Sequence, residues 1–452
     1  MLRRVLLVAV AIAVALSVAV WSGAAQAGTV FVVTGRGFGH GVGMSQYGAY
    51  GFAQQGLTYN KILAHYYPGT QLVKTSVSSL RVHLAHARET VSVGSHARFR
   101  LVDALGRSLS LDAGNYVLGR DLQLTVNGTE VRPSSPVRAV PGALPLAFAG
   151  RPYRGELLVT ATPSLTVMNS VRLEDYLRGV VPMEMPATWA LEALKAQAVA
   201  ARSYALATRR QTGRALELEA GASDQVYGGI AAEDNRTDAA IVTTRGQVLF
   251  YAGQPAATLF FSSSGGRTAA ATDVWPERDL VPYLTSVDDP YDSISPYHEW
   301  GPLRLTDRDL VRHLSTRAPR GLRDATYTVT RSGRVGSVTL VGASDASTTV
   351  NGATFASLLG LRSTWFSVSV LRLETLQETN PGRGFTLSGT VRGFRNVRLE
   401  QRTERGWMLV MGIAPEPDGS FRAVVSPVGP TTYRLVAPGV VGPAVRIALP
   451  GA

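Results

Sequence analysis

Short stretches in which hydrophobic and polar residues alternate recur in the first half of the chain and predict β-strands. Turn residues such as Asn127–Gly128 separate these stretches. We therefore expect a β-rich subdomain over residues 77–168. The stretches are Leu80–Leu84, Phe99–Val102, Leu122–Val126 and Glu156–Thr160.

Two other stretches carry hydrophobic residues at helical spacing. The first follows Thr58, which can cap a helix, and Pro68–Gly69 stops it. Its apolar face consists of Tyr59, Ile62, Leu63 and Tyr66. The second is alanine-rich and runs from Thr188 to about Arg209. Its apolar face consists of Leu191, Leu194, Ala198, Ala201 and Ala205.

Residues 384–452 again have the pattern of strands, with a turn at Asp418–Gly419 and frequent proline. This pattern is typical of a small β-sandwich of the immunoglobulin-like kind. The polar stretch from Glu374 to Gly384 is expected to be a linker before it. The predicted fold class is therefore α+β, with a mixed core over residues 169–372 between the β-rich subdomain and the C-terminal sandwich.

The N-terminus has the features of a secretory signal peptide. Arg3–Arg4 precede the apolar stretch Val5–Val20, and Ala25–Ala27 has a small-residue cleavage pattern. We expect residues 1–27 to be removed and Gly28 to begin the mature protein. An uncleaved membrane anchor is the alternative, because the apolar stretch is nearly long enough to span a bilayer. No later stretch is continuously apolar, so no membrane span is expected after cleavage.

Composition narrows the possible chemistry. The 452 residues are 45% hydrophobic and 17% charged, which is normal for packed domains. The chain has no cysteine, so disulfides, thiol nucleophiles and thiolate metal sites are excluded. The net charge of +12 is spread without a lysine-rich tract or an aromatic array, and no nucleic-acid partner is expected. Two explanations of this charge are equally good: the protein binds anionic polymers of the cell envelope, or its surface is basic without a partner.

Glu184 is the most informative candidate for catalysis. It lies between Met183 and Met185 in a predicted turn framed by Pro182 and Pro186. Apolar methionine side chains around a carboxyl would raise its pKa, as a general acid near neutral pH requires. The positive end of the following helix would favour the ionised form instead. The sequence leaves open which influence is larger.

The segment Gly35–Ala49 alternates glycine with polar residues. Glycine lets the backbone come close to a ligand, and the polar side chains suit sugar hydroxyls and acetamides. The segment lacks the residues of a phosphate-binding loop and the Rossmann spacing. A glycine-rich hairpin without a ligand is the alternative.

Three further clusters contain polar residues near glycine or proline: Asp224–Gly229, Phe260–Thr268, and Tyr283–Asp292 continued at His298. The serines of the second cluster precede a Gly-Gly turn without a nucleophile-elbow motif, which favours turn formation or hydroxyl binding. In the third, the carboxylates lack the spacing of a calcium loop and the histidine stands alone. We therefore interpret the third cluster as turn-capping and predict no metal there.

Together these motifs resemble those of the SpoIID/LytB family, cell-wall proteins of bacterial sporulation and amidase modification. The resemblance covers roughly residues 35–370. It depends on Leu173–Pro186 with the helix after it, on Ser262–Thr268, on Arg362–Phe366 and on the segment around His40.

The resemblance implies a site. Characterised sporulation members are lytic transglycosylases of peptidoglycan glycan strands, and the glutamate of this signature, here Glu184, is their catalytic acid. We expect no cofactor and no metal, because the zinc site of some members contains cysteine. Implied glycan-lining residues are His40, Ser45, Gln46, Gln225, Tyr227, Ser262 and Ser263.

The order of the motifs departs from the family. There, the glycine-rich segment and its helix follow the strand that Arg362–Phe366 begins, whereas here they precede everything else. The chain therefore resembles a circularly permuted member, in which residues 28–76 return to the core across a long tether.

Two functions remain open from the sequence. The first is cleavage of the bond between N-acetylmuramic acid and N-acetylglucosamine without water, with Glu184 as acid and then base. Hydrolysis stays possible because Glu174, Asp175 and Glu192 are near in sequence. The alternative is a non-catalytic peptidoglycan-binding protein that enhances an N-acetylmuramoyl-L-alanine amidase. Expected partners are glycan strands and, in this alternative, the amidase. The expected location is secreted, at the cell wall, with the C-terminal domain as spacer or wall contact.

Overall fold

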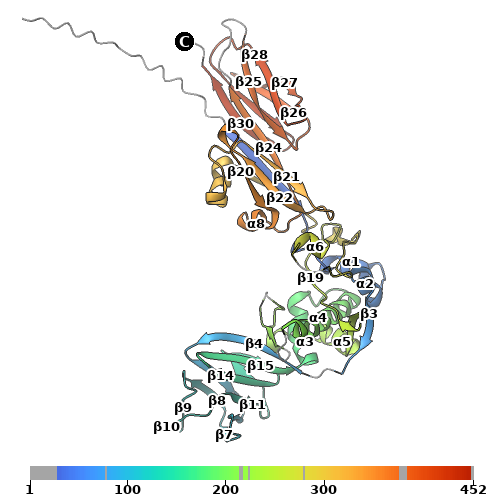
Figure 1. Cartoon of the computed structure of the whole chain (residues 1–452), viewed down its shortest axis with the longest axis vertical. Coiled ribbons are helices and arrows are strands. Elements are labelled where there is room, and N and C mark those ends of the chain that lie inside the picture. The colour runs from blue at the N-terminus through green and yellow to red at the C-terminus, as the bar shows by residue number, and fades with distance from the viewer. Residues whose placement is uncertain are drawn as a thin grey trace, which may run out of the picture.

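The structure is a computed structural model that describes residues 28–76, 79–212, 217–221, 224–277, 280–375 and 384–448. The predicted signal peptide lies outside these residues. Figure 1 shows an elongated molecule with a β-rich end, a helical middle and a second β-rich end. Within the described ranges, no helix is long and apolar enough to cross a membrane.

The first β-rich end confirms the strand pattern of the sequence. Its strands are β4 (Ser79–Arg88), β5 (Val91–Ser95), β6 (Phe99–Val102), β7 (Ser108–Leu111), β8 (Gly114–Leu118), β11 (Val137–Val140), β12 (Leu146–Phe148), β13 (Arg151–Tyr153), β14 (Glu156–Ala161), β15 (Leu165–Arg172) and β16 (Glu217–Glu219). One sheet has the order β16-β4-β15-β14-β11-β6-β7 and the other β13-β12-β5-β8. The pairs are antiparallel except that β16 runs parallel to β4. Alternate side chains of these strands, including Phe99, Leu157 and Val167, fill one core.

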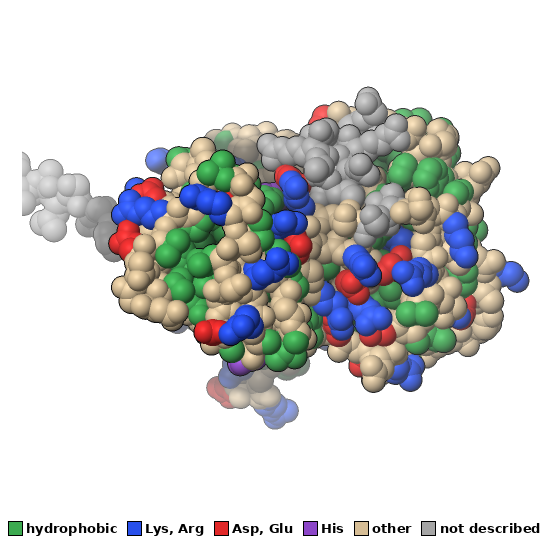
Figure 2. Space-filling view, turned by 90° about the horizontal axis from the view of Figure 1, so that it is seen from below, with side chains coloured by type: hydrophobic (Ala, Val, Ile, Leu, Met, Phe, Trp, Pro, Cys, Tyr) green, Lys and Arg blue, Asp and Glu red, His purple; other side chains and the backbone are tan. Residues whose placement is uncertain are grey.

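A small hairpin at this end shows how local sequence sets a turn. The strands β9 (Leu124–Val126) and β10 (Thr129–Val131) pair antiparallel. Asn127 and Gly128 between them have φ of 51° and 80°, which a two-residue hairpin turn requires. The predicted turn is confirmed, although the strand begins at Leu124 and not at Leu122. Seen from this end in Figure 2, Lys and Arg side chains lie among Asp and Glu.

Helices form the middle of the molecule: α1 (Gln46–Gln54), α2 (Tyr59–Tyr66), α3 (Leu173–Glu184), α4 (Leu191–Thr212) and α5 (Asn235–Thr243). The predicted helix after Thr58 is α2, and the predicted alanine-rich helix is α4, which begins at Leu191 and not at Thr188. The small residues of α4 allow α1, α2, α3 and α5 to pack directly against it. Residues of the N-terminal segment, such as Met44 and Ile62, share a buried core with Leu194.

The second β-rich end contains two sheets that face each other. Their strands are β1 (Gly28–Arg36), β20 (Glu299–Thr306), β24 (Phe366–Thr375), β25 (Phe385–Arg392), β26 (Val397–Thr403), β27 (Gly406–Ile413), β28 (Ser420–Val425), β29 (Thr431–Ala437) and β30 (Val440–Ile447). The orders are β20-β1-β24-β25-β28 and β27-β26-β29-β30. Their common core includes Val32 and Leu371 beside Leu387 and Leu435. The C-terminal strands thus do not close a sandwich alone, because β1 and β24 complete it.

The predicted linker before the C-terminal strands is only partly visible. β24 ends at Thr375 and β25 begins at Phe385, and residues 376–383 lie outside the described residues.

Beside β24, a third sheet joins β21 (Asp324–Val329), β22 (Val335–Val341) and β23 (Ser347–Asn351). The helices α7 (Asp307–Leu314) and α8 (Gly352–Leu358) pack near it.

The N-terminal strand lies where a permutation would put it. β1 pairs antiparallel with β24, so that Gly28 lies opposite Leu373 and Gly35 opposite Phe366. The start of β1 is therefore beside the end of β24, and one short turn would join them in the usual family order. This pairing supports the permutation, which stays a proposal.

Candidate active site around Glu184

Glu184 is the last residue of α3, and the predicted turn at this position is wrong. The helix continues through Pro182, and Met185 after it is extended. Of the two flanking methionines, Met185 is buried in the core that contains Met44 and Leu194, whereas Met183 is 48% exposed. Proline removes only one helical hydrogen bond here, and so close to the helix end this does not unwind α3.

The carboxyl of Glu184 lines a cavity of about 480 Å³. Its walls include four aromatic side chains, Phe38, Phe260, Phe261 and Trp275. Its polar lining consists of Glu184, His40, Tyr204, Asp224 and Ser262. An apolar cavity with a few convergent polar groups is the usual form of a small-molecule or saccharide site.

Two hydrogen bonds hold the carboxylate of Glu184. The amide of Gln46 donates from Nε2 to Oε2 over 3.3 Å, and the backbone N–H of Val226 donates to Oε1 over 3.3 Å. Burial raises the pKa of Glu184, and these two hydrogen bonds oppose the rise without cancelling it. The question that the sequence left open is thus decided in favour of a raised pKa.

His40 lies in the cavity wall but has no free ring nitrogen. The backbone N–H of Val42 donates to its Nδ1 over 3.1 Å, so Nε2 carries the proton and donates to the carbonyl of Phe260 over 3.1 Å. Burial, with a contribution from Arg334, lowers the pKa of His40 to about 4. The imidazole is therefore neutral near pH 7, and it can offer a substrate only its ring face.

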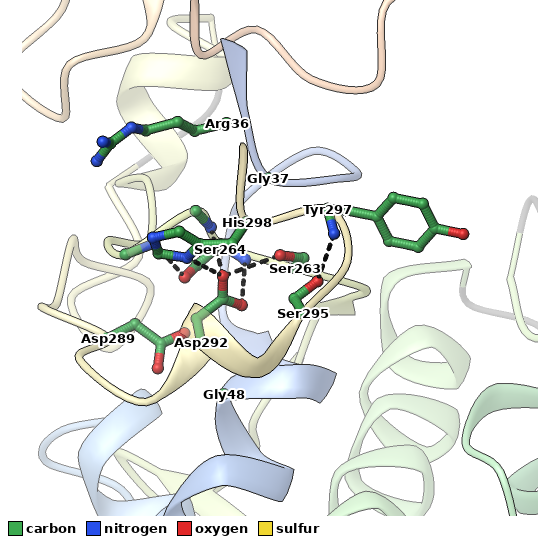
Figure 3. Close-up of polar contacts among 12 residues, drawn as sticks. Arg36, Gly37, Gly48, Ser263, Ser264, Asp289, Asp292, Ser295, Tyr297 and His298 are labelled. Carbon is green, nitrogen blue, oxygen red and sulfur yellow. Dashed lines mark hydrogen bonds and ion pairs between the residues drawn. The ribbon is translucent and has the colours of Figure 1, made fainter. Parts of the chain in front are cut away.

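Of the other predicted glycan-lining residues, Ser262 lines the cavity and Gln46 contacts Glu184, whereas Ser45 and Ser263 are fully buried and do not line it. Both buried hydroxyls donate to Asp292, over 2.9 Å each. Asp292 also accepts the backbone N–H groups of Ser264 and Gly265 (Figure 3). The turn-capping interpretation of this cluster is confirmed for Asp292, which organises the loops under the cavity.

Gln225 and Tyr227 are buried beside α3. The hydroxyl of Tyr176 donates to Gln225 over 3.0 Å, and Tyr227 donates to Asn169 over 2.9 Å. Neither residue is among those lining the Glu184 cavity. Their neighbour Asp224 does line the cavity, although the sequence did not single it out as a site residue.

Asp224 is the second carboxylate of the cavity. The hydroxyl of Tyr204 donates to its Oδ1 over 3.1 Å, and the backbone N–H of Glu219 donates to Oδ2 over 2.7 Å. Glu174, Asp175 and Glu192, which left hydrolysis possible in the sequence, are not among the residues that line the cavity. Their ionic partners are Arg202 for Glu174, Arg178 for Asp175 and Lys195 for Glu192.

These features define a class of protein: a mixed α+β chain in which a partly buried glutamate with a raised pKa lies in an aromatic-walled cavity. Comparison with known proteins shows which family the chain resembles. Residues 161–251, which contain Glu184, match the family Stage II sporulation protein (SpoIID). Together with the relatives below, this match supports the similarity to the SpoIID/LytB family that the motifs predicted.

Three relatives carry the comparison. Over 116 residues the chain is 44% identical to the amidase enhancer of Bacillus subtilis (strain 168), covering 26% of this chain and 15% of that protein. Over 150 residues it is 36% identical to stage II sporulation protein D of the same organism, covering 29% and 43%. Over 180 residues it is 29% identical to stage II sporulation protein D of Bacillus amyloliquefaciens, covering 34% and 52%. The chain thus spans about half or less of each of these relatives.

Proposed function

We propose that this protein is an exported lytic transglycosylase that cleaves peptidoglycan glycan strands between N-acetylmuramic acid and N-acetylglucosamine. The observation that carries the proposal is the carboxyl of Glu184, which lines the aromatic-walled cavity and has a pKa raised by burial. The family match over residues 161–251 and the relative named amidase enhancer support a role at the cell wall.

The geometry supplies an acid that can become a base. Protonated Glu184 donates its proton to the glycosidic oxygen, and the bond from that oxygen to C1 of the muramic acid breaks as positive charge develops there. The resulting carboxylate is stabilised by the N–H groups of Gln46 and Val226. It then accepts the proton of the muramoyl 6-hydroxyl while O6 bonds to C1. The product is a 1,6-anhydro sugar, and no water is consumed.

Asp224 is the carboxylate that a hydrolytic route through this cavity would have to use. A hydrolase needs a second carboxylate that can hold water or attack C1. Both oxygens of Asp224 already accept hydrogen bonds within the protein, from Tyr204 and from Glu219. In this proposal Asp224 holds the segment before Val226, and cleavage by water activated at Asp224 would instead give reducing ends without anhydro ends.

Product analysis tests the reaction. Purified glycan strands are incubated with the chain that begins at Gly28, and the products are analysed by mass spectrometry. We expect 1,6-anhydromuramoyl ends, and their loss in Glu184→Gln. The control variant Glu89→Gln changes an exposed glutamate far from the cavity and should keep full activity. Reducing ends without anhydro ends would reject transglycosylation, and full activity of Glu184→Gln would remove Glu184 from the mechanism.

A second candidate function is enhancement of a cell-wall amidase without cleavage. It is favoured by the 44% identity over 116 residues to a relative named amidase enhancer. Dye release from labelled cell wall separates the two. Release by the protein alone supports the enzyme, whereas release only when an amidase is present supports the enhancer. In either case we propose a secreted location at the cell wall, with the C-terminal strands as spacer or wall contact.

A further inference from the structure

Two histidines and two glutamates gather outside the Glu184 cavity, where β4 and β16 pair. His83 and His86 come from β4, and Glu217 and Glu219 from β16. Ligand atoms of His83, His86 and Glu219 all lie within 4.8 Å of one another. Nε2 of His86 is 2.9 Å from Glu219, and Nε2 of His83 is 3.2 Å from Glu217.

The backbone of β4 is shaped so that both imidazoles share one face. In a regular strand, residues three apart point to opposite faces. Here Ala85 pairs with Val167, and the adjacent pair is His83 with Met168, so β4 contains an extra residue. Such a bulge re-aims the side chains that follow it. As a result, the rings of His83 and His86 are stacked, with centroids 4.6 Å apart and planes at 20°.

The chemistry of the cluster suits a divalent transition metal. Imidazole nitrogen and carboxylate oxygen are ligands of Zn²⁺, and hard cations such as Ca²⁺ prefer oxygen alone. The side chains of His86 and Glu219 are 51% and 44% exposed, so an ion can enter from solvent. The side chain of His83 is 13% exposed, but its Nδ1 is buried and has no hydrogen-bond partner among the described residues. Two ordinary ion pairs would leave this unexplained.

We propose that His83, His86 and Glu219 bind a divalent transition-metal ion such as Zn²⁺, with Glu217 or water as the fourth ligand. Zinc bonds to nitrogen and oxygen are about 2.0–2.2 Å long, so the donors would draw together around the ion. Arg81 lies 4.0 Å from Glu217 and competes with the ion for that carboxylate. Glu217 is therefore a weaker candidate ligand than Glu219. The sequence predicted no metal, and the proposed site departs from that prediction.

An ion at this place would be connected to the Glu184 cavity. The backbone N–H of Glu219 donates to Asp224, which lines the cavity, and Val226 two residues later donates to Glu184. The ion would therefore fix β16 to β4 and hold the segment that carries these two groups. The metal site itself does not depend on the proposed function.

Calorimetric titration with ZnCl₂ tests the proposal on the chain from Gly28, after treatment with EDTA and dialysis. We expect one Zn²⁺ per chain. His86→Ala and Glu219→Gln should each weaken binding at least about tenfold, because each removes one of three ligands. The matched control is His96→Ala, which removes an exposed histidine of the same subdomain and should bind as the wild type does.

Two further measurements keep the result independent of catalysis and of folding. X-ray absorption at the zinc edge should show imidazole ligands, and thermal melts should show the variants folded. Added Zn²⁺ should also slow hydrogen exchange over residues 217–221 and 224–228. Wild-type protein that binds no Zn²⁺, or equal affinity of the wild type and folded His86→Ala, overturns the proposal whether or not the protein cleaves glycan.

Discussion

Glu184 and Asp292 are both carboxylates at places where distant parts of the chain meet, yet they have different surroundings. Glu184 accepts two hydrogen bonds of 3.3 Å and lines an open cavity. Asp292 is 0% exposed and accepts five, of 2.9–3.0 Å, two on Oδ1 and three on Oδ2. Five donors saturate a carboxylate, so Asp292 has no lone pair left for a substrate.

The comparison separates a carboxyl that can change its protonation from one that anchors loops. A general acid needs access to substrate and few donors, so that the protonated form is not disfavoured. An anchor needs the opposite, since each buried donor requires an acceptor. Each prediction below removes one of these differences.

Replacing Glu184 should have the largest effect. We expect Glu184→Gln to slow glycan cleavage by about 10²–10⁴-fold, because the amide cannot donate and recover the proton. Its melting temperature should stay equal to that of the wild type or rise, because the neutral amide removes a partly buried charge. Rates of anhydro-sugar formation and thermal melts measure the two effects. A large loss of stability would show that Glu184 is an anchor as well.

In contrast to Glu184→Gln, Asp292→Asn should mainly lower the stability of the fold. The amide matches the carboxylate in shape, but its NH₂ group cannot accept, and at least two of the five donors lose their acceptor in either orientation. We expect unfolding free energy to fall by about 3 kcal/mol, at 1–3 kcal/mol for each unsatisfied buried donor. Denaturant titration measures this loss. An unchanged unfolding free energy would contradict the anchoring role.

The sequence could predict the parts of this picture that depend on local pattern. Alternation predicted β6 and β14, and helical spacing predicted α2. It could not predict that β1 and β24 join the C-terminal strands in one sheet. That pairing joins residues more than 300 positions apart, for which a local pattern carries no signal.

The site shows the same limit at the scale of single residues. The motif located Glu184, but in the segment 224–227 the structure buries Gln225 and Tyr227 and turns Asp224 and Val226 toward the cavity. Successive side chains of such a segment point to opposite faces, so a segment that buries Gln225 and Tyr227 directs Asp224 and Val226 to the other face. The bulky aromatic ring of Tyr227 was the available signal that this face points inward.

Asp289, close to Asp292 in the chain, allows a third test of how surroundings change a carboxyl. It is 0% exposed, Tyr66 donates to its Oδ1 over 2.8 Å, and its Oδ2 has no partner among the described residues. Burial, with the nearby charge of Asp292, raises the pKa of Asp289 to about 7, above its value of 3.8 in the unfolded chain. The folded state therefore binds the proton more tightly, and stability from this group is lost as pH rises from about 4 to about 7.

We expect Asp289→Asn to be more stable than the wild type at pH 8 by up to about 4 kcal/mol, at about 1.36 kcal/mol for each pKa unit, and about equally stable near pH 4. The two proteins share all other titrating groups, so the difference between their denaturant midpoints isolates Asp289. A difference that is independent of pH would show that its proton is not linked to folding.

The smallest expected effect comes from removing one of the two donors of Glu184. Gln46→Leu keeps the size of a buried side chain and deletes the N–H that favours the ionised carboxylate. The pKa of Glu184 should rise further, because that hydrogen bond lowers it. Cleavage requires the protonated acid, so the high-pH limb of the rate profile should move up by about half to one pH unit. The maximal rate should fall at the same time, because the anion formed after proton donation loses a donor. A limb that moves to lower pH, or does not move, would mean that the Gln46 hydrogen bond does not stabilise the ionised form of Glu184.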